Sequence, residues 1–286
     1  MTHTPDQNTS GLIPIKGSFQ PNSFHLWCMG IVIVIGGQYF SWNFALAAGF
    51  GSCCISTFLI SFGYISLCCC TSELTSALPF AGGAYGLARC SLGFYAGFMV
   101  GCGEALEYIT YTAVSTVTFI SMIVSIAPSL EGYEPLLWLA FYVVSLAIYI
   151  LCPRQLFYHI IVFLAVISTA LLLVFCFGSL KYVDFAANAT PRFTGGAEAF
   201  FVNLSLPIWF YIGVESMNMA ADDVSEPRIQ IPRAQITCVL TLFVTAILVL
   251  FITCSLPPGI GEIATDLLPF NRGNICVSVY ALLVCF

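Results

Sequence analysis

Long apolar stretches separated by short polar segments make up most of this chain. A helix needs about 20 predominantly apolar residues to cross the hydrocarbon core of a bilayer. Seven stretches have about that length, and an eighth begins shortly before the last residue. We expect spans at 25–47, 50–70, 92–126, 135–151, 156–178, 198–221 and 234–256, and the start of another at 274–286. The pattern predicts an all-α polytopic membrane protein.

The composition supports this class. The chain is 59% hydrophobic and 8% charged, with a mean hydropathy of +0.95, whereas roughly 25% of residues are charged in a typical soluble domain. The net charge of -6, without a basic tract, gives no sign of a nucleic-acid partner. The sequence also shows no nucleophile with a base at motif spacing and no metal-ligand cluster. We therefore expect neither an enzyme nor a cofactor or metal site.

The first 24 residues form a polar tail without the layout of a cleaved signal peptide, and 25–286 form one transmembrane domain. Lys and Arg favour one side of the membrane by five to three. One side has Lys16, Arg89, Arg154, Arg228 and Arg233, and the other has Lys181, Arg192 and Arg272. Because cytoplasmic loops are enriched in these residues, we expect a cytoplasmic N-terminus in a multi-pass plasma-membrane protein. The sequon at Asn188 then lies outside.

Two spans contain residues that interrupt a helix. In the first, Gly36 and Gly37 precede the polar residue Gln38, and in the sixth Pro207 and Gly213 lie close to Glu215. A glycine pair can also simply allow two helices to pack closely. Interruptions at corresponding positions of two halves, however, are typical of the solute site of a secondary transporter. The freed N–H groups and carbonyls would then be available to a solute.

The third span has a polar stripe that includes Glu104, Tyr108, Tyr111 and Ser115, which recur every three or four residues and so share one helix face. Glu107 lies three residues after Glu104. A carboxyl group inside a bilayer is costly and is a functional hypothesis by default. Each of these carboxyl groups is either neutral and hydrogen-bonded to a neighbouring helix, or matched to a proton or a cationic solute.

Two longer segments carry a family resemblance. Glu73–Tyr85 resembles the E-L-x-S-x-x-P-x-x-G-G-x-Y signature that follows the second helix of amino acid/polyamine/organocation permeases. Phe210–Glu215 and Ala220–Ala234 resemble the F-x-x-G-x-E and A-E-E-x-x-x-P-x-x-x-I-P-R-A motifs of the same family. In the second motif we expect Pro227 and Pro232 to end the sixth helix and Arg233 to begin the seventh.

The resemblance implies a fold of two inverted five-helix repeats with broken first and sixth helices, working by alternating access. The second repeat would be incomplete, because family members commonly have about twelve spans. Gly37–Gly49 and Glu107–Tyr108 look most like the ethanolamine permease branch. Where the family has a small-residue signature at the first break, this chain has Gln38. A bulky amide there would favour a small amine over an amino acid with its α-carboxylate.

The sequence thus predicts a secondary transporter for a small organic amine or amino acid, with an unknown coupling ion. The expected solute site comprises Gly36, Gly37, Gln38, Tyr108, Tyr111, Phe210, Tyr211, Gly213 and Glu215, and the candidate partners for a proton or an ammonium are Glu104, Glu107 and Glu215. The alternative is a truncated fragment of such a permease that does not transport. A heptahelical receptor is disfavoured by the cytoplasmic N-terminus and the paired interruptions.

Overall fold

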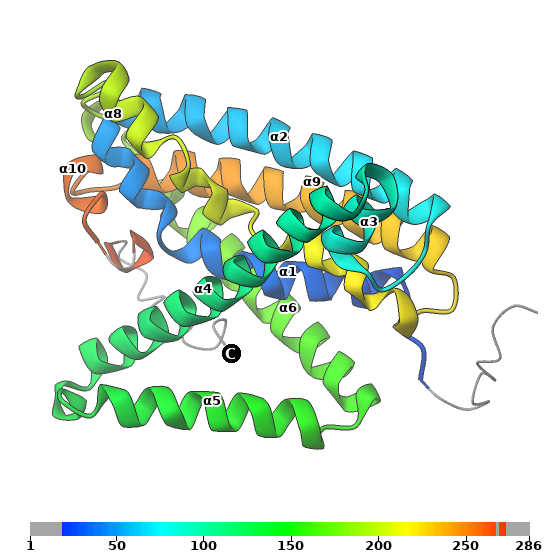
Figure 1. Ribbon diagram of the computed structural model, residues 1–286. Helices are drawn as coiled ribbons and strands as arrows, with labels where there is room; N and C mark the ends of the chain where they lie inside the picture. The colour runs from blue at the N-terminus through cyan, green and yellow to red at the C-terminus, as the bar shows by residue number, and fades with distance from the viewer. Residues whose placement is uncertain (1–18, 267–268, 273–286) are drawn as a thin grey trace, which may run out of the picture.

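The computed structural model describes residues 19–266 and 269–272 (Figure 1). Seven helical segments in this part are long and apolar enough to cross a membrane: Ser23–Ala48, Phe50–Ala77, Phe94–Ser125, Glu134–Leu151, Arg154–Tyr182, Gly196–Asp223 and Pro227–Cys254. They confirm the seven spans expected from the hydrophobic pattern. Residues 1–18 of the expected tail and the expected eighth span at 274–286 lie outside the described residues.

Short 3-10 helices interrupt or extend several of the spans. The α-helices are α1 (Ser23–Tyr39), α2 (Phe50–Ala77), α3 (Gly83–Leu92), α4 (Phe94–Ile126), α5 (Glu134–Leu151), α6 (Arg154–Gly178), α7 (Phe185–Asn188), α8 (Gly196–Asn203), α9 (Pro227–Cys254) and α10 (Ile260–Ile263). The 3-10 helices are η1 (Trp42–Ala48), η2 (Pro128–Leu130), η3 (Ser179–Tyr182), η4 (Leu206–Phe210), η5 (Val214–Asp223) and η6 (Pro269–Arg272).

Helix α1 lies at the centre of the bundle, in contact with α6, α9, η4 and η5. Its sequence is apolar on all sides, as expected for a helix surrounded by others. Helices α2 and α9 run side by side along their lengths (Figure 1). The buried hydroxyls of Ser56, Thr57 and Ser61 on α2 each donate to the carbonyl four residues earlier. Small residues of this kind let membrane helices approach closely without leaving polar groups unpaired.

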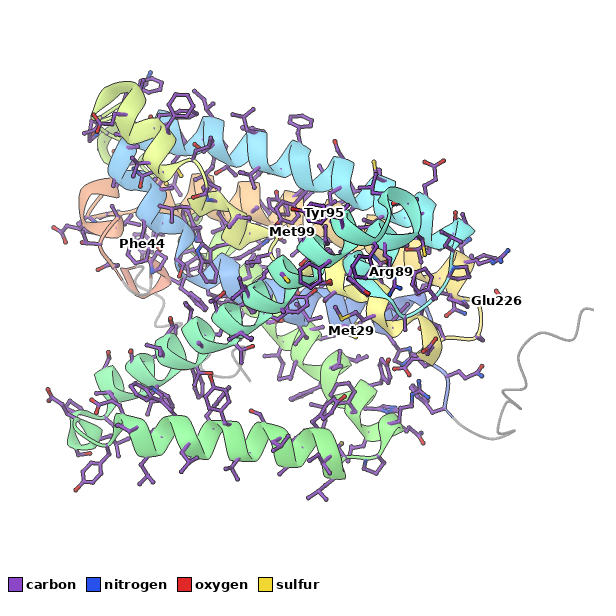
Figure 2. All side chains as sticks on the ribbon, viewed as in Figure 1. Met29, Phe44, Arg89, Tyr95, Met99 and Glu226 are labelled. Atoms are coloured by element: carbon purple, nitrogen blue, oxygen red, sulfur yellow. The ribbon has the colours of Figure 1, made fainter. Side chains whose placement is uncertain are left out.

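Helix α5 stands apart from this bundle. It is joined to α4 and α6 at its ends, and the three helices outline an open triangle (Figure 1). None of its side chains is buried among the described residues, and Figure 2 shows them projecting from both sides of the helix, some toward the other helices and some away from them. The apolar surface of α5 is therefore available to lipid or to further protein.

The structure corrects one expected boundary. Helix α9 begins at Pro227 and contains Pro232, so the two prolines do not separate the sixth span from the seventh helix. A proline at the first helical position is favourable, since the N–H groups of the first turn have no partner within the helix. Pro232 lies in the second turn and removes one further hydrogen bond. The sixth span instead ends at Asp223, at the end of η5.

Candidate functional site

The interruptions of the first and sixth spans lie against each other. The first falls at Phe40 and Ser41, between α1 and η1, where Ser41 has the left-handed φ of 72°. The sixth span leaves α-helical geometry after α8 and turns again at Gly213, which has a φ of 95°. Elements η1 and η4 are in contact, and the ring of Trp42 stacks on that of Phe210 at 5.1 Å.

The expected break at Gly36 and Gly37 was misplaced, because α1 continues through both residues to Tyr39. A Cβ atom on Gly37 would overlap the carbonyl oxygen of Trp209, whereas one on Gly36 would meet only the ring of Phe40, at 3.9 Å. Gly37 is therefore required for the close approach of the two interrupted spans. Gly37 therefore fits the other interpretation of the glycine pair, in which glycine allows two helices to pack closely.

A cavity of about 320 Å³ opens beside these interruptions, between α1, α4 and α5. Its lining is aromatic and hydroxyl-rich: Val32, Ile33, Gly36, Phe40, Tyr111, Thr112, Ser115, Thr116, Phe141, Tyr142 and Ser145. Two of the expected site residues, Gly36 and Tyr111, belong to it. None of the lining residues is a Lys, Arg, Asp or Glu, so the cavity wall carries no fixed charge at neutral pH.

Tyr111 connects the cavity to both interrupted spans. Its hydroxyl donates to the carbonyl of Ile33 at 2.7 Å, and its ring stacks on Trp209 at 5.8 Å. Nearby, the hydroxyls of Ser115 and Ser145 make no hydrogen bond within the part of the chain that the structure describes. These two hydroxyls are free to contact a solute.

Three expected site residues point into the protein instead. The amide of Gln38 donates to the Leu242 carbonyl in α9 at 3.1 Å, and Phe210 is buried against Trp42. The hydroxyl of Tyr211 lies 2.6 Å from that of Ser61. The Gln38 contact joins the first span to α9, the Tyr211 contact joins the sixth span to α2, and the Phe210 contact joins the two interrupted spans to each other. The Gln38 side chain is therefore not placed to crowd a solute in the cavity.

Glu104 is engaged by backbone groups. Its carboxylate oxygens accept hydrogen bonds from the N–H groups of Ala84 and Tyr85, at 3.4 and 3.1 Å, and from the Tyr108 hydroxyl at 3.3 Å. These N–H groups belong to the first turn of α3, where a negative charge is favourable. Glu104 thus caps α3, and Tyr108 joins this cap instead of lining the cavity. Of the two possibilities that the sequence left open for each carboxyl group, Glu104 therefore fits hydrogen bonding to a neighbouring helix.

Glu215 lacks partners of this kind. It is 9% exposed and lies just after the turn at Gly213, where the backbone N–H groups near its carboxyl oxygens are those of Gly213 and of Glu215 itself. Glu107 of α4 is one of its ionisable neighbours. Neither Glu107 nor Glu215 belongs to the cavity lining.

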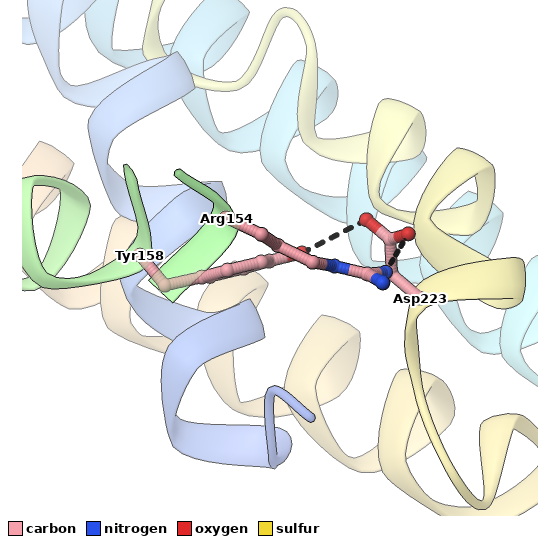
Figure 3. A network of polar contacts seen from close by, with 3 residues as sticks. All are labelled: Arg154, Tyr158 and Asp223. Atoms are coloured by element: carbon pink, nitrogen blue, oxygen red, sulfur yellow. Dashed lines mark hydrogen bonds and ion pairs between the residues drawn. The ribbon is translucent and has the colours of Figure 1, made fainter. Parts of the chain in front are cut away.

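A second polar contact joins the start of α6 to the end of the sixth span. Figure 3 shows Arg154 and Tyr158 of α6 both reaching Asp223 of η5. Arg154 forms an ion pair with one carboxylate oxygen, and the Tyr158 hydroxyl donates to the other at 3.2 Å. The ion pair is open to solvent, since the two side chains are 41% and 45% exposed.

We expect Arg154→Ala to lower the free energy of unfolding by less than about 1 kcal/mol, because exposed ion pairs contribute little. Thermal unfolding of the purified protein in detergent checks this. Tyr158→Phe, which removes the neighbouring hydroxyl from the same carboxylate, is a matched control and should have an effect of similar size. A large loss of stability in Arg154→Ala alone would show that the ion pair holds the two spans together.

Comparison with known proteins identifies the family. A profile described as amino acid permease matches residues 22–271. The chain belongs to the amino acid permease family. The permease is 26% identical over 265 residues to an uncharacterised transporter of Rhizobium meliloti (strain 1021), covering 87% of this chain and 56% of that relative. It is 24% identical over 274 residues to the methylthioribose transporter of Bacillus subtilis (strain 168), covering 89% and 56%.

This permease therefore spans a little over half the length of these two curated relatives. Family membership confirms the resemblance seen in the motifs, and with it an all-α polytopic membrane protein. The cavity also contains residues outside the expected site, namely Val32, Ile33, Phe40, Thr112, Ser115, Thr116, Phe141, Tyr142 and Ser145. Only Ser115 had a usable signal, since it lies on the polar stripe of the third span.

Proposed function

We propose that this permease carries a small organic amine or amino acid across the membrane by alternating access. The main support is the contact between the interruptions of the first and sixth spans, beside a cavity that is large enough for a small solute. Interrupted helices at membrane depth are tolerated only where they line a cavity or lie inside protein. Their unpaired backbone groups are then available to bind a solute and to change partners as the spans move.

Within this class, the cavity favours an amine without a carboxylate, similar to ethanolamine. The rings of Phe40, Tyr111 and Phe141 surround the space, and an ammonium group is attracted to aromatic faces. The free hydroxyls of Ser115 and Ser145 suit a hydroxyl or amine group of the solute. An α-carboxylate would find no cationic side chain in the lining. The preference for an amine rests on this lining and not on Gln38.

A second candidate is a neutral, hydroxyl-bearing solute. The Bacillus subtilis relative is named a methylthioribose transporter, and an uncharged lining of hydroxyls and aromatic rings also suits such a molecule. Uptake of labelled ethanolamine, of mixed amino acids and of methylthioribose by cells that express the chain separates these candidates. Saturable uptake of none of the three, at normal membrane expression, would contradict the proposed function.

We expect Tyr111→Phe to weaken solute binding about fivefold, because the loss of one hydrogen bond costs about 1 kcal/mol. The substitution keeps the ring but frees the carbonyl of Ile33. The concentration dependence of uptake measures the effect. Tyr149→Phe removes a hydroxyl from the 77% exposed Tyr149 on α5 and should behave as wild type. Equal affinities in the two variants would show that the Tyr111 hydroxyl does not contribute to solute binding.

We further propose that the N-terminus lies in the cytoplasm and that the membrane is the plasma membrane. The Lys and Arg distribution over the loops supports this orientation. An epitope tag at the N-terminus that antibodies reach only in permeabilised cells would agree with it. Staining of the tag in intact cells would show that the N-terminus lies outside the cell.

A further inference from the structure

Helices α3 and α4 form a tight antiparallel hairpin that turns at Gly93, whose φ is 94° (Figure 1). Two glycines of α4, one turn apart, face α3. A Cβ atom on Gly97 would lie 2.8 Å from the Cα atom of Arg89, and one on Gly101 would lie 2.9 Å from the ring of Tyr85. Because glycine has no side chain, Arg89 and Tyr85 lie directly against the backbone of α4.

The guanidinium group of Arg89 is held in one orientation by this packing. It donates to the Tyr85 hydroxyl at 2.8 Å. It also lies over the ring of Phe94, 5.5 Å from the ring centre, and 6.0 Å from the centre of the Tyr85 ring. A guanidinium group has five N–H donors. Within the described residues only the bond to Tyr85 uses them, so most of the donors of a well-positioned cation are left for another molecule.

No carboxylate balances this charge in the part of the chain that the structure describes. Arg89 is exposed, and the ion pair found among the described residues joins Arg154 to Asp223. The carboxylate of Glu104 binds N–H groups in the first turn of α3, whereas Arg89 lies in the last turn. The exposed positive charge is therefore available to an anionic group.

The residues around Arg89 are apolar and exposed. Leu92, Phe94, Tyr95 and Phe98 are 74%, 68%, 77% and 53% exposed, and the rings of Phe94 and Phe98 stack at 6.4 Å. We call these four residues and Arg89 the Arg89 patch; Arg89 and Tyr95 are labelled in Figure 2. The third span begins at Phe94, so the patch lies where a span enters the membrane. A fixed cation beside exposed apolar rings at this level suits a molecule with an anionic head and apolar tails.

We propose that the Arg89 patch binds an anionic phospholipid, with the phosphate group on the guanidinium and the acyl chains along Phe98 and the neighbouring apolar side chains. The planar guanidinium can donate two parallel hydrogen bonds to phosphate oxygens. A zwitterionic lipid also has a phosphate group, but its own ammonium group offsets the attraction to Arg89. Anionic lipids give the cytoplasmic leaflet its negative potential, and α3 lies on that side in the orientation proposed above.

Native mass spectrometry of the purified chain tests this site. The chain is released from micelles that contain equal amounts of phosphatidylglycerol and phosphatidylcholine, and the retained lipids are counted. We expect wild type to retain one phosphatidylglycerol in preference to phosphatidylcholine. Arg89→Gln should lower this retention about tenfold, because hydrogen bonds to charged groups are among the stronger ones. Arg228→Gln removes the same charge from an exposed residue at the start of α9 and should behave as wild type.

Equal retention of the two lipids by wild type would overturn the proposal, and so would equal losses in the two variants, since binding would then follow the total charge. Thermal unfolding in the same mixtures shows whether Arg89→Gln folds. If it does not, Arg89→Lys takes its place, because lysine keeps the charge but lacks the planar pair of donors. This variant should also retain less phosphatidylglycerol than wild type, and unchanged retention would contradict the site.

Inorganic phosphate alone distinguishes a lipid from a free anion. If it raises the unfolding temperature of wild type as much as phosphatidylglycerol does, Arg89 binds free phosphate and the lipid site is wrong. The lipid site does not depend on the proposed transport function. Lipid retention as expected, together with no uptake of any solute, would support the lipid site and refute the transport function.

Discussion

Gly37→Ala is expected to lose most of the folded, transport-competent protein, because the new methyl group would overlap a backbone atom. The carbonyl oxygen of Trp209 occupies the space where the Cβ atom would lie, and a backbone oxygen cannot rotate away as a side chain can. Overpacking a well-packed interior typically costs about 1–3 kcal/mol. Thermal unfolding in detergent and the amount of protein in the membrane measure the loss.

Gly36→Ala provides a matched control at the neighbouring position. A Cβ atom there would lie 3.9 Å from the ring of Phe40, which is an ordinary contact. We expect stability close to wild type, although this residue lines the cavity and its substitution can change solute affinity. Equal stability of the two variants would show that the interrupted spans do not approach each other as closely as described.

The spans themselves were predictable from the sequence, since each is a run of apolar residues bounded by polar or helix-breaking ones. The length requirement of the bilayer fixes such segments without knowledge of their neighbours. The α9 boundary differs from the prediction that Pro227 and Pro232 end a helix, because a proline near a helix start is tolerated. Helix α3 was not expected, because its ten residues are too few to show as a span.

The position of the first break was not predictable in the same way. Glycine permits both a broken helix and close helix packing, and the sequence around Gly37 does not distinguish these possibilities. The chain turns at Ser41, a residue type that only infrequently adopts the left-handed conformation observed there. The choice depends on Trp209, which is distant in sequence and contacts α1 only in the folded protein.

The partners of the carboxyl groups were also not predictable from the local sequence. Glu104, Glu107 and Glu215 have similar apolar surroundings in the sequence, and each was a candidate partner for a proton or an ammonium. In the fold Glu104 caps α3, while Glu215 is buried just after the turn at Gly213 and Glu107 is only partly buried. The partners of Glu104 lie about twenty residues away, on a helix that the hydrophobic pattern did not predict.

Glu215→Gln is expected to lower uptake by more than about tenfold, equivalent to about 1.4 kcal/mol. The amide is close in shape to the carboxyl group but can neither bind nor release a proton. It carries no charge, so the variant should reach the membrane and unfold at a temperature equal to or above that of wild type. A gain in stability together with a loss of activity is typical of a buried functional group whose local environment disfavours folding.

Uptake of the solute and membrane expression should be measured together, with Glu73→Gln as the control for a carboxylate that is exposed. Normal uptake by Glu215→Gln at normal expression would exclude a transport role for this carboxyl group. Loss of both uptake and stability would instead indicate that Glu215 holds η5 in place. The two results differ because a positioning role shows as a loss of stability, whereas proton transfer requires a group that changes its charge and shows as a loss of uptake alone.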